Sequence, residues 1–162
     1  MNPSLGFSVS ATTRRKRETE VDGKDYFFLT EEEFNRRVAN NEFAETEEVY
    51  PGKWYGTLKS EIDRLLNAGQ DILFDLDVKG GLSIKKLYPE ACLIFIKAPS
   101  FDVLKQRLAG RKTEDAATVQ KRLDRVPLEL ELGKQFDYQV VNDALQTAID
   151  DVQKIVANHL QH

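Results

Sequence analysis

The chain has 162 residues, enough for one domain with a sizeable core. Hydrophobic residues make up 41% and charged residues 31%, as in ordinary soluble globular proteins. The net charge of −4 disfavours a general attraction to nucleic acid or anionic membrane, and no apolar run approaches the roughly 18 residues that cross a bilayer.

The sequence also lacks the residues of a disulfide framework or a zinc site. Cys92 is the single cysteine, and His159 and His162 are the only histidines. The N-terminus lacks the layout of a signal peptide, because its basic residues follow the weakly apolar stretch. We therefore expect a cytoplasmic protein with no nucleic-acid, membrane or obligate protein partner.

A short apolar strand at Phe7–Ser10 leads into the basic cluster Arg14–Arg17. Guanidinium groups donate several hydrogen bonds in one plane and can enclose a phosphate. Taken alone, such a cluster is more often a solvated basic turn. The hydroxyl residues before it would suit an anion site, but the neighbouring motifs described below are what favour that interpretation.

Residues 26–57 predict a small β-rich lobe. Its expected strands are short and rich in aromatic or β-branched residues: Tyr26–Leu29, Glu42–Tyr50 and Lys53–Thr57. A turn at Pro51-Gly52 joins the last two. Thr30 with Glu33 forms a capping box for a helix that ends near Asn40.

Beyond the lobe, apolar strands alternate with amphipathic helices, which predicts an α/β fold. The expected strands are Asp71–Leu76, Cys92–Lys97 and Tyr138–Asn142. Their nearly continuous apolar character is typical of parallel strands covered by helices. Thr57, Ser100 and Asp143 are the expected N-terminal caps, and Gly69 and Gly110 follow the ends of two helices.

Pro127 lies where Gln120–Leu132 would otherwise form one long helix. A proline inside a helix costs about 3 kcal/mol and usually kinks or ends it. We therefore expect a break or two shorter helices.

Two acids, Asp75 and Asp77, close the apolar strand that begins at Asp71. Ligands of parallel α/β sheets bind at the carboxyl ends of the strands, so both acids are candidate site residues. Glu45, by contrast, is one acid among many in the acidic stretch 31–48, and its residue type alone does not distinguish it.

Several motifs, in order and at matching spacing, resemble the guanylate kinase family. They are Ser8–Arg14 with Arg17, Gly23–Phe28, Glu42–Glu45, Tyr55–Thr57, Asp75–Gly80, Arg107–Arg111, Lys121–Leu123 and Val141–Asp143. The resemblance runs from Gly6 to the C-terminus. It implies a single domain with a P-loop NTP-hydrolase-like parallel sheet flanked by helices, in which residues 26–57 form an inserted GMP-binding lobe. It also implies transfer of the γ-phosphoryl group of ATP to GMP with Mg²⁺.

The resemblance implies a role for each matching position. The GMP phosphate would be held by Arg14, Arg17, Tyr26 and Tyr55. The guanine would be read by Ser10, Glu45, Thr57 and Asp77. The ATP phosphates would contact Arg111 and Arg122, and Asn142 would approach the adenine. The catalytic set would be Arg14, Asp75, Arg111 and Arg122. The chemistry agrees, because one carboxylate can accept both N–H groups of guanine and a hydroxyl can donate to its carbonyl.

The chain departs from the family pattern at three points. Lys16 and Lys112 stand where the family has proline and glycine. The larger departure is the missing sequence Gly-x-x-Gly-x-Gly-Lys-Ser/Thr, whose amides and lysine hold ATP phosphates. We expect that truncation removed this P-loop and the first central strand. A polypeptide of these residues should then be poorly stable, with an exposed strand edge and little ATP-dependent activity.

Two other functions fit parts of the pattern. A non-catalytic guanylate-kinase-like module could bind GMP or a phosphorylated peptide, although a peptide binder has no need of Glu45 and Thr57. A nucleic-acid binder could use Arg14–Arg17, but the net charge of −4 disfavours it.

Overall fold

Residues 5–110 and 116–160 are described by the computed structural model, and contacts divide the chain into two units, 1–87 and 88–162. Each unit contains helices and a pair of parallel strands, which confirms the predicted α/β class. Among the described residues, no helix is both long enough and apolar enough to cross a membrane.

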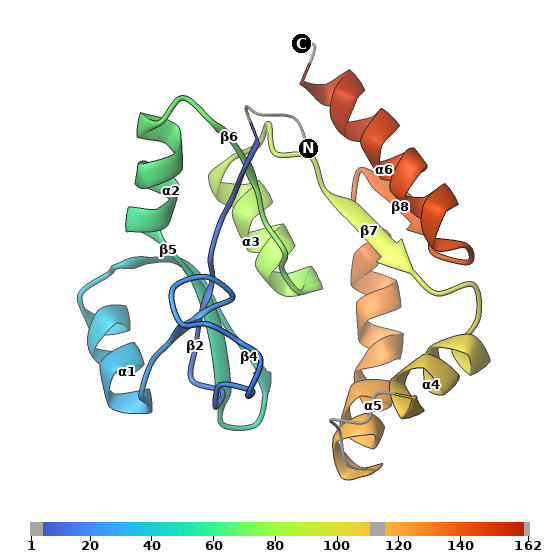
Figure 1. Ribbon diagram of the computed structural model, residues 1–162, viewed down its shortest axis with the longest axis horizontal. Helices are drawn as coiled ribbons and strands as arrows, with labels where there is room; N and C mark the ends of the chain where they lie inside the picture. Colours follow the sequence, from blue (N-terminus) through green and yellow to red (C-terminus); the bar gives the residue numbers. More distant parts are fainter. Residues whose placement is uncertain (1–4, 111–115, 161–162) are drawn as a thin grey trace. The chain divides into compact units, whose positions relative to one another are not determined.

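Unit 1 contains a four-stranded sheet with the strand order β3-β2-β5-β4. Its strands are β2 (Ala11–Thr12), β3 (Phe27–Phe28), β4 (Phe43–Tyr50) and β5 (Lys53–Leu58). The antiparallel hairpin β4–β5 was predicted and is confirmed (Figure 1). β2 pairs parallel with β3 and antiparallel with β5, so this sheet also includes a strand from outside residues 26–57.

Helix α1 (Glu31–Ala39) buries its apolar face against this sheet. The Oγ1 atom of Thr30 accepts a hydrogen bond from the Glu33 amide at 3.1 Å, which confirms the Thr30 half of the predicted capping box, while the Glu33 carboxylate pairs with Arg36 and Arg37. Phe34 stacks on Phe43 with 4.6 Å between ring centroids. The remaining members of this core are Ala11, Phe27, Leu29, Trp54 and Leu58.

The rest of unit 1 is a parallel strand pair with two helices. Its elements are β1 (Leu5–Phe7), α2 (Lys59–Asn67), β6 (Asp71–Leu73) and α3 (Val78–Leu87), and β1 pairs with β6. Both strands differ from the prediction, since β1 begins and ends earlier than expected and β6 stops at Leu73. Gly69 follows α2 with φ 67°, a left-handed conformation that suits glycine, so the predicted helix end is confirmed.

One expectation for unit 1 is corrected, and one of its helices was not predicted. Thr57 does not cap α2, whose N-cap is Leu58 and has no side-chain cap bond. The Thr57 hydroxyl instead donates to Glu45 on the neighbouring strand. Helix α3 was not predicted, because Gly80 and Gly81 lower helix propensity in a segment that tertiary contacts nevertheless hold as a helix.

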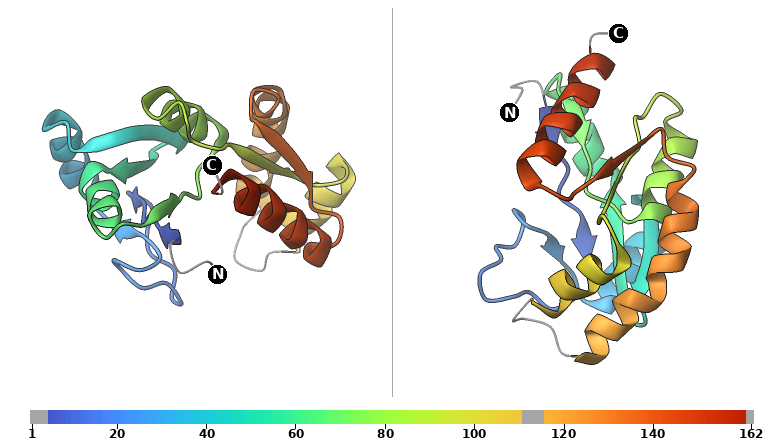
Figure 2. Two further views of the ribbon diagram at one scale, coloured as in Figure 1. Left: turned by 90° about the horizontal axis from the view of Figure 1, so that it is seen from above. Right: turned by 90° about the vertical axis from the view of Figure 1, so that its right-hand side faces the viewer.

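Unit 2 pairs two parallel strands, β7 (Ile94–Lys97) and β8 (Tyr138–Val141). Its helices are α4 (Phe101–Ala109), α5 (Ala116–Gly133) and α6 (Leu145–His159), with α6 lying along β8 (Figure 2). The Ser100 side chain caps α4 as predicted, through a bond from the Val103 amide. Gly133 lets α5 approach β7 closely, because a Cβ there would lie 2.6 Å from the Phe95 ring.

The predicted break at Pro127 is wrong, because α5 continues through it. Pro127 cannot donate to the carbonyl one turn before it, at a cost of about 3 kcal/mol. Leu123 and Val126, which lie in the helical turn before Pro127, are both buried. Burying such side chains stabilises by about 1.5–3 kcal/mol each, which is enough to offset the lost bond.

The predicted cap at Asp143 is also wrong. The N-cap of α6 is Ala144, and no side chain caps this end. The carbonyls of Asn142 and Asp143 accept hydrogen bonds from the Arg107 guanidinium at 2.6 and 3.1 Å. Arg107 therefore ties α4 to the segment that follows β8.

Candidate active site

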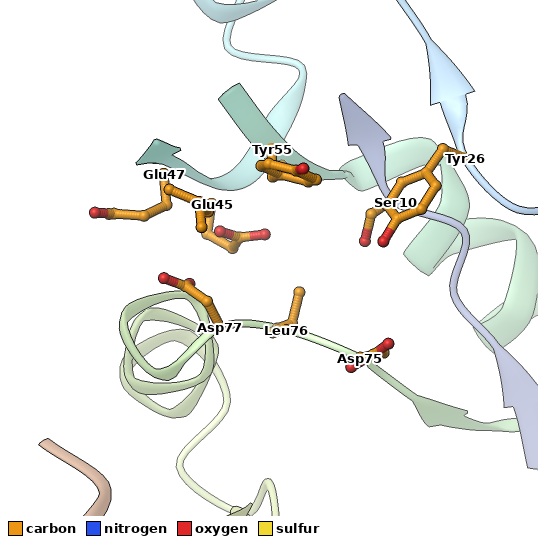
Figure 3. A pocket seen from close by; sticks show the side chains of 10 residues that line it. Ser10, Tyr26, Glu45, Glu47, Tyr55, Asp75, Leu76 and Asp77 are labelled. Carbon is orange, nitrogen blue, oxygen red and sulfur yellow. The ribbon is translucent and has the colours of Figure 1, made fainter. Parts of the chain in front are cut away.

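A cavity of about 190 Å³ in unit 1 gathers most of the site residues predicted for that unit (Figure 3). Its lining residues are Ser10, Tyr26, Glu45, Glu47, Val49, Tyr55, Gly56, Asp75, Leu76 and Asp77. Carboxylates from β4 and from the start of α3 face each other at one end of the close-up, and the hydroxyls of Ser10 and Tyr26 lie at the other. The cavity thus has an acidic end and a hydroxyl-rich end.

Glu45 and Thr57 form the buried pair of the acidic end. They are direct partners in the register of β4 and β5, and the Thr57 hydroxyl donates to Glu45 Oε1 at 2.7 Å. Glu45 is 9% exposed and Thr57 is fully buried. Burial raises the pKa of Glu45, the Thr57 bond partly opposes that rise, and the nearby Asp77 charge adds to it. A carboxylate has about four acceptor positions, so capacity for a ligand's N–H groups remains.

Asp77 joins this end from the position directly before α3. Its Oδ1 atom accepts a hydrogen bond from the Gly80 amide at 2.9 Å, so the side chain also caps the helix. A Cβ on Gly80 would lie 3.1 Å from Asp77 Oδ1 and 3.2 Å from Glu45 Oε2. Glycine at this position therefore leaves room for both carboxylates beside α3.

Glu47 is a cavity residue that the sequence analysis did not select. It lies two residues after Glu45 on β4, and alternate strand residues share a face, so the strand period offered a signal for it. Lys79 Nζ donates to Glu47 Oε1 at 2.8 Å, which balances one of the acidic charges.

The hydroxyl-rich end combines aromatic rings with an arginine. Tyr26 meets Tyr55 edge to face, with 6.0 Å between ring centroids. The Arg14 guanidinium carbon lies 5.3 Å from the Tyr26 ring centroid and 5.6 Å from that of Phe28. Burial raises the pKa of Tyr26, and the Asp75 charge does so to a smaller degree. Tyr26, Tyr55 and Asp75 line the cavity, whereas Arg14 is not a lining residue and reaches this end through its contact with the Tyr26 ring.

Arg14 is paired with Glu20, another residue that the sequence analysis did not select. The two side chains form parallel hydrogen bonds of 2.8 and 3.0 Å. This Glu20 bond is the main cause of a raised Arg14 pKa, with a smaller rise from Tyr55.

A second cavity of about 230 Å³ is lined by Phe7, Ser10, Glu20, Lys24, Asp25, Tyr26 and Asp75. Arg17 belongs to the same segment, with its Nη1 atom 3.8 Å from Glu20 Oε1.

The predicted ATP-binding residues lie elsewhere. Arg122 is on α5 and Asn142 directly follows β8, both in unit 2, and neither lines the two cavities of unit 1. Arg111, like Lys112, lies outside the described residues. In the part of the chain that the structure describes, no three His, Cys, Asp or Glu side chains gather into a group that could hold a metal ion.

The comparisons with known proteins all point to one family. The guanylate kinase family model matches residues 2–159. The guanylate kinase of Bacteroides thetaiotaomicron is 45% identical over 160 residues, which covers 98% of this chain and 78% of that protein. The guanylate kinase of Thermotoga maritima is 47% identical over 150 residues, covering 93% of this chain and 72% of its own length.

A solved structure supports the same assignment. The crystal structure of guanylate kinase from Anaplasma phagocytophilum aligns with a TM-score of 0.80 and 29% sequence identity, covering 96% of this chain and 76% of that one. The P-loop NTP-hydrolase-like fold predicted from the motifs is therefore confirmed. The chain belongs to the guanylate kinase family.

Proposed function

We propose that the protein is a guanylate kinase that transfers the γ-phosphoryl group of ATP to GMP, giving GDP and ADP. The observation that carries this proposal is the cavity of unit 1, which has Glu45, bonded to Thr57, at one end and Tyr26, whose ring the Arg14 guanidinium contacts, at the other. Such a cavity offers acceptors for a purine's N–H groups and donors for a phosphate. Family membership supports the same function.

At the acidic end, Glu45 would accept hydrogen bonds from N1–H and the N2 amino group of guanine, with Asp77 beside it. The hydroxyls proposed to read the rest of the base are those of Thr57, which already donates to Glu45, and of Ser10, which would reach the base from the hydroxyl-rich end of the cavity. Adenine lacks the N1–H and N2 donors, so it would leave buried carboxylate oxygens without partners. Sites built in this way discriminate strongly.

At the other end, Arg14, Tyr26 and Tyr55 would hold the GMP phosphate. Arg14 lies over the Tyr26 ring, and Tyr55 contributes to its raised pKa, so these three side chains are already close together. Arg17, whose side chain is 46% exposed, would add a second positive charge.

In the transfer, an oxygen of the GMP phosphate attacks the γ-phosphorus of ATP, and the bond from that phosphorus to the β-phosphate oxygen breaks, so that ADP leaves. Asp75, which lines both cavities, would lie near the transferring group. Arg111 and Arg122 would stabilise the phosphate charge, and Asn142 would contact the adenine.

Mg²⁺ would accompany ATP and neutralise part of the phosphate charge. Asp75 supplies the type of oxygen ligand that this ion prefers, and the phosphates would supply others.

The 162 residues contain no Gly-x-x-Gly-x-Gly-Lys-Ser/Thr sequence, so we expect a polypeptide of these residues to bind GMP while turning over ATP poorly. Nucleotide binding is therefore the more direct readout of the proposal. We also propose the cytoplasm as the protein's compartment.

The proposal is tested by calorimetric titration of the purified protein with GMP, AMP and a phosphoserine peptide. GMP should bind at least about a hundredfold more tightly than AMP, because a site that hydrogen-bonds a substrate's polar groups rejects analogues that lack them. The peptide should not bind measurably. Equal affinity for GMP and AMP, or binding of the peptide without GMP, would contradict the proposed function.

Binding of the base should depend on pH through Glu45. Burial raises the pKa of this carboxyl above its ordinary value of 4.5, and only the ionised form accepts both guanine N–H groups. Affinity should therefore rise with pH as Glu45 loses its proton and fall again on acidification. Guanosine is the ligand to use, because the GMP phosphate itself titrates near a pKa of about 6. Fluorescence titrations from about pH 5 to about pH 8 should show this rise in the natural protein and lose it in Glu45→Gln.

A further inference from the structure

Glu20 lies at the centre of the polar contacts in the segment between β2 and β3. Its Oε1 atom accepts a hydrogen bond from Arg14 Nη2 at 2.8 Å, and its Oε2 atom accepts one from Arg14 Nη1 at 3.0 Å. Oε2 also accepts the Arg17 amide at 2.7 Å, and the Glu20 carbonyl accepts Lys16 Nζ at 3.0 Å. The Glu20 side chain is 12% exposed and its bonds to Arg14 are partly buried, whereas the contacts with Arg17 and Lys16 are exposed.

The Arg14 guanidinium is fixed from several directions. The rings of Tyr26 and Phe28 lie within cation–π distance, and the Arg15 carbonyl accepts a third hydrogen bond from Arg14 at 2.8 Å. A guanidinium has five N–H donors, so the bonds to Glu20 and to Arg15 engage three of them. The side chain is 13% exposed, and Tyr55, a cavity residue, interacts with it.

Two roles for Glu20 are compatible with a bidentate pair. The carboxylate could occupy the place that a ligand's phosphate takes, in which case it must leave when the ligand binds. Alternatively, it could stay and hold the guanidinium while the remaining donors contact the phosphate. Departure would break both Arg14 bonds and the Arg17 amide bond. The observed anchoring on three neighbouring residues favours the role in which Glu20 stays.

We propose that Glu20 is a positioning residue, which holds the Arg14 guanidinium in the orientation that binds the GMP phosphate. This inference rests on the proposed function, because it assumes that Arg14 contacts that phosphate. Glu20 acts through Arg14 and does not touch the base.

The charge state of Glu20 supports this role. Hydrogen bonds from Arg14, opposed by burial and reinforced by the Arg17 amide, hold the pKa of Glu20 at about 2, so the carboxylate stays ionised throughout the physiological range. The positive charge of Arg17 and Lys16 keeps the segment attractive to phosphate.

The test is a double-mutant cycle measured by calorimetry with GMP and with guanosine. Glu20→Ala should weaken GMP binding about tenfold, as expected for loss of a group that orients a ligand-binding side chain, and should leave guanosine binding unchanged. Glu20→Gln keeps one acceptor oxygen and should fall between the natural protein and Glu20→Ala. In the Arg14→Ala background, Glu20→Ala should have no further effect on GMP.

Glu18→Ala is the matched control, because it removes the same charge from an exposed position two residues away. Tighter GMP binding by Glu20→Ala would show that the carboxylate competes with the phosphate and would overturn the inference. An equal tenfold loss in the Arg14→Ala background, or an equal loss for guanosine, would also overturn it. If Glu20→Ala does not fold, Glu20→Gln decides by the same comparison. Failure of the natural protein to bind GMP would instead refute the proposed function itself.

Discussion

Replacing Glu45 by glutamine should weaken GMP binding about a hundredfold. The carboxylate is the proposed acceptor for two N–H groups of guanine, and hydrogen bonds to charged groups contribute about 1.5–3 kcal/mol each. The glutamine amide presents an NH₂ group where an acceptor is needed, so at least one bond is replaced by a donor–donor contact. A loss of about 3 kcal/mol corresponds to roughly two factors of ten in affinity. Calorimetric titration of the variant with GMP measures it.

The same substitution should leave the fold intact. Burial raises the pKa of Glu45, which means that the folded protein holds the charged form at a cost. A neutral amide removes that cost, and its oxygen can still accept the Thr57 hydroxyl. Glu48→Gln on the same strand is a matched control, since Glu48 is exposed and its acceptor bond to the Gly52 amide can be retained by glutamine. Unchanged GMP affinity in Glu45→Gln, or an equal loss in Glu48→Gln, would contradict the assignment of the guanine end.

Local sequence signals predicted much of unit 1. The Thr30 cap, the turn at Pro51-Gly52 and the end of α2 before Gly69 each depend on one or two neighbouring residues, and the structure contains all three. Strand ends were predicted less well, because the apolar run that begins at Asp71 continues past the point where β6 stops pairing with β1 at Leu73. An apolar run indicates which residues are buried. The end of a strand, however, is set by where its pairing with the neighbouring strand stops.

The failures share a cause, which is that tertiary contacts overrode a local preference. The sequence predicts a break at Pro127, but Leu123 and Val126 are buried and α5 continues. The sequence predicts a helix cap at Thr57, but Glu45 lies opposite it on β4 and takes its hydroxyl bond. A threonine hydroxyl can cap a helix or bond to a neighbouring strand, and a proline can end a helix or lie within one. Only the packing of the folded chain decides which of these occurs.

The acids around the two cavities illustrate which site residues a sequence can reveal. Glu45 does not stand out among the many acids around it, and only the family resemblance selected it. Glu20 and Glu47 were not selected at all, because their importance depends on pairing with Arg14 and Lys79. Lys79 is 32 positions beyond Glu47 in the chain, and the fold alone brings the two together.

Removing the Arg14 side chain should produce the second large effect, a loss of GMP affinity of about tenfold to a hundredfold. The guanidinium is proposed to donate charge-assisted hydrogen bonds to the phosphate, which contribute about 1.5–3 kcal/mol, or one to two factors of ten. Guanosine lacks the phosphate, so Arg14→Ala should bind it as the natural protein does. Parallel titrations with the two ligands measure this difference.

Arg14→Ala should also lower stability in a pH-dependent way, because Glu20 loses its principal partner. The folded pKa of Glu20 is about 2, below its ordinary value of 4.5, so the pair stabilises the fold above about pH 4.5 and loses that contribution as the pH falls towards 2. Urea unfolding should therefore show a larger difference between Arg14→Ala and the natural protein near neutral pH than near pH 2. Arg15→Ala removes the same charge from an exposed neighbouring position. It should leave the urea midpoint unchanged and should change GMP affinity by no more than about twofold at physiological ionic strength.

An equal loss of guanosine and GMP binding in Arg14→Ala would contradict the phosphate assignment. It would mean that the residue supports the cavity as a whole, and that the phosphate binds elsewhere.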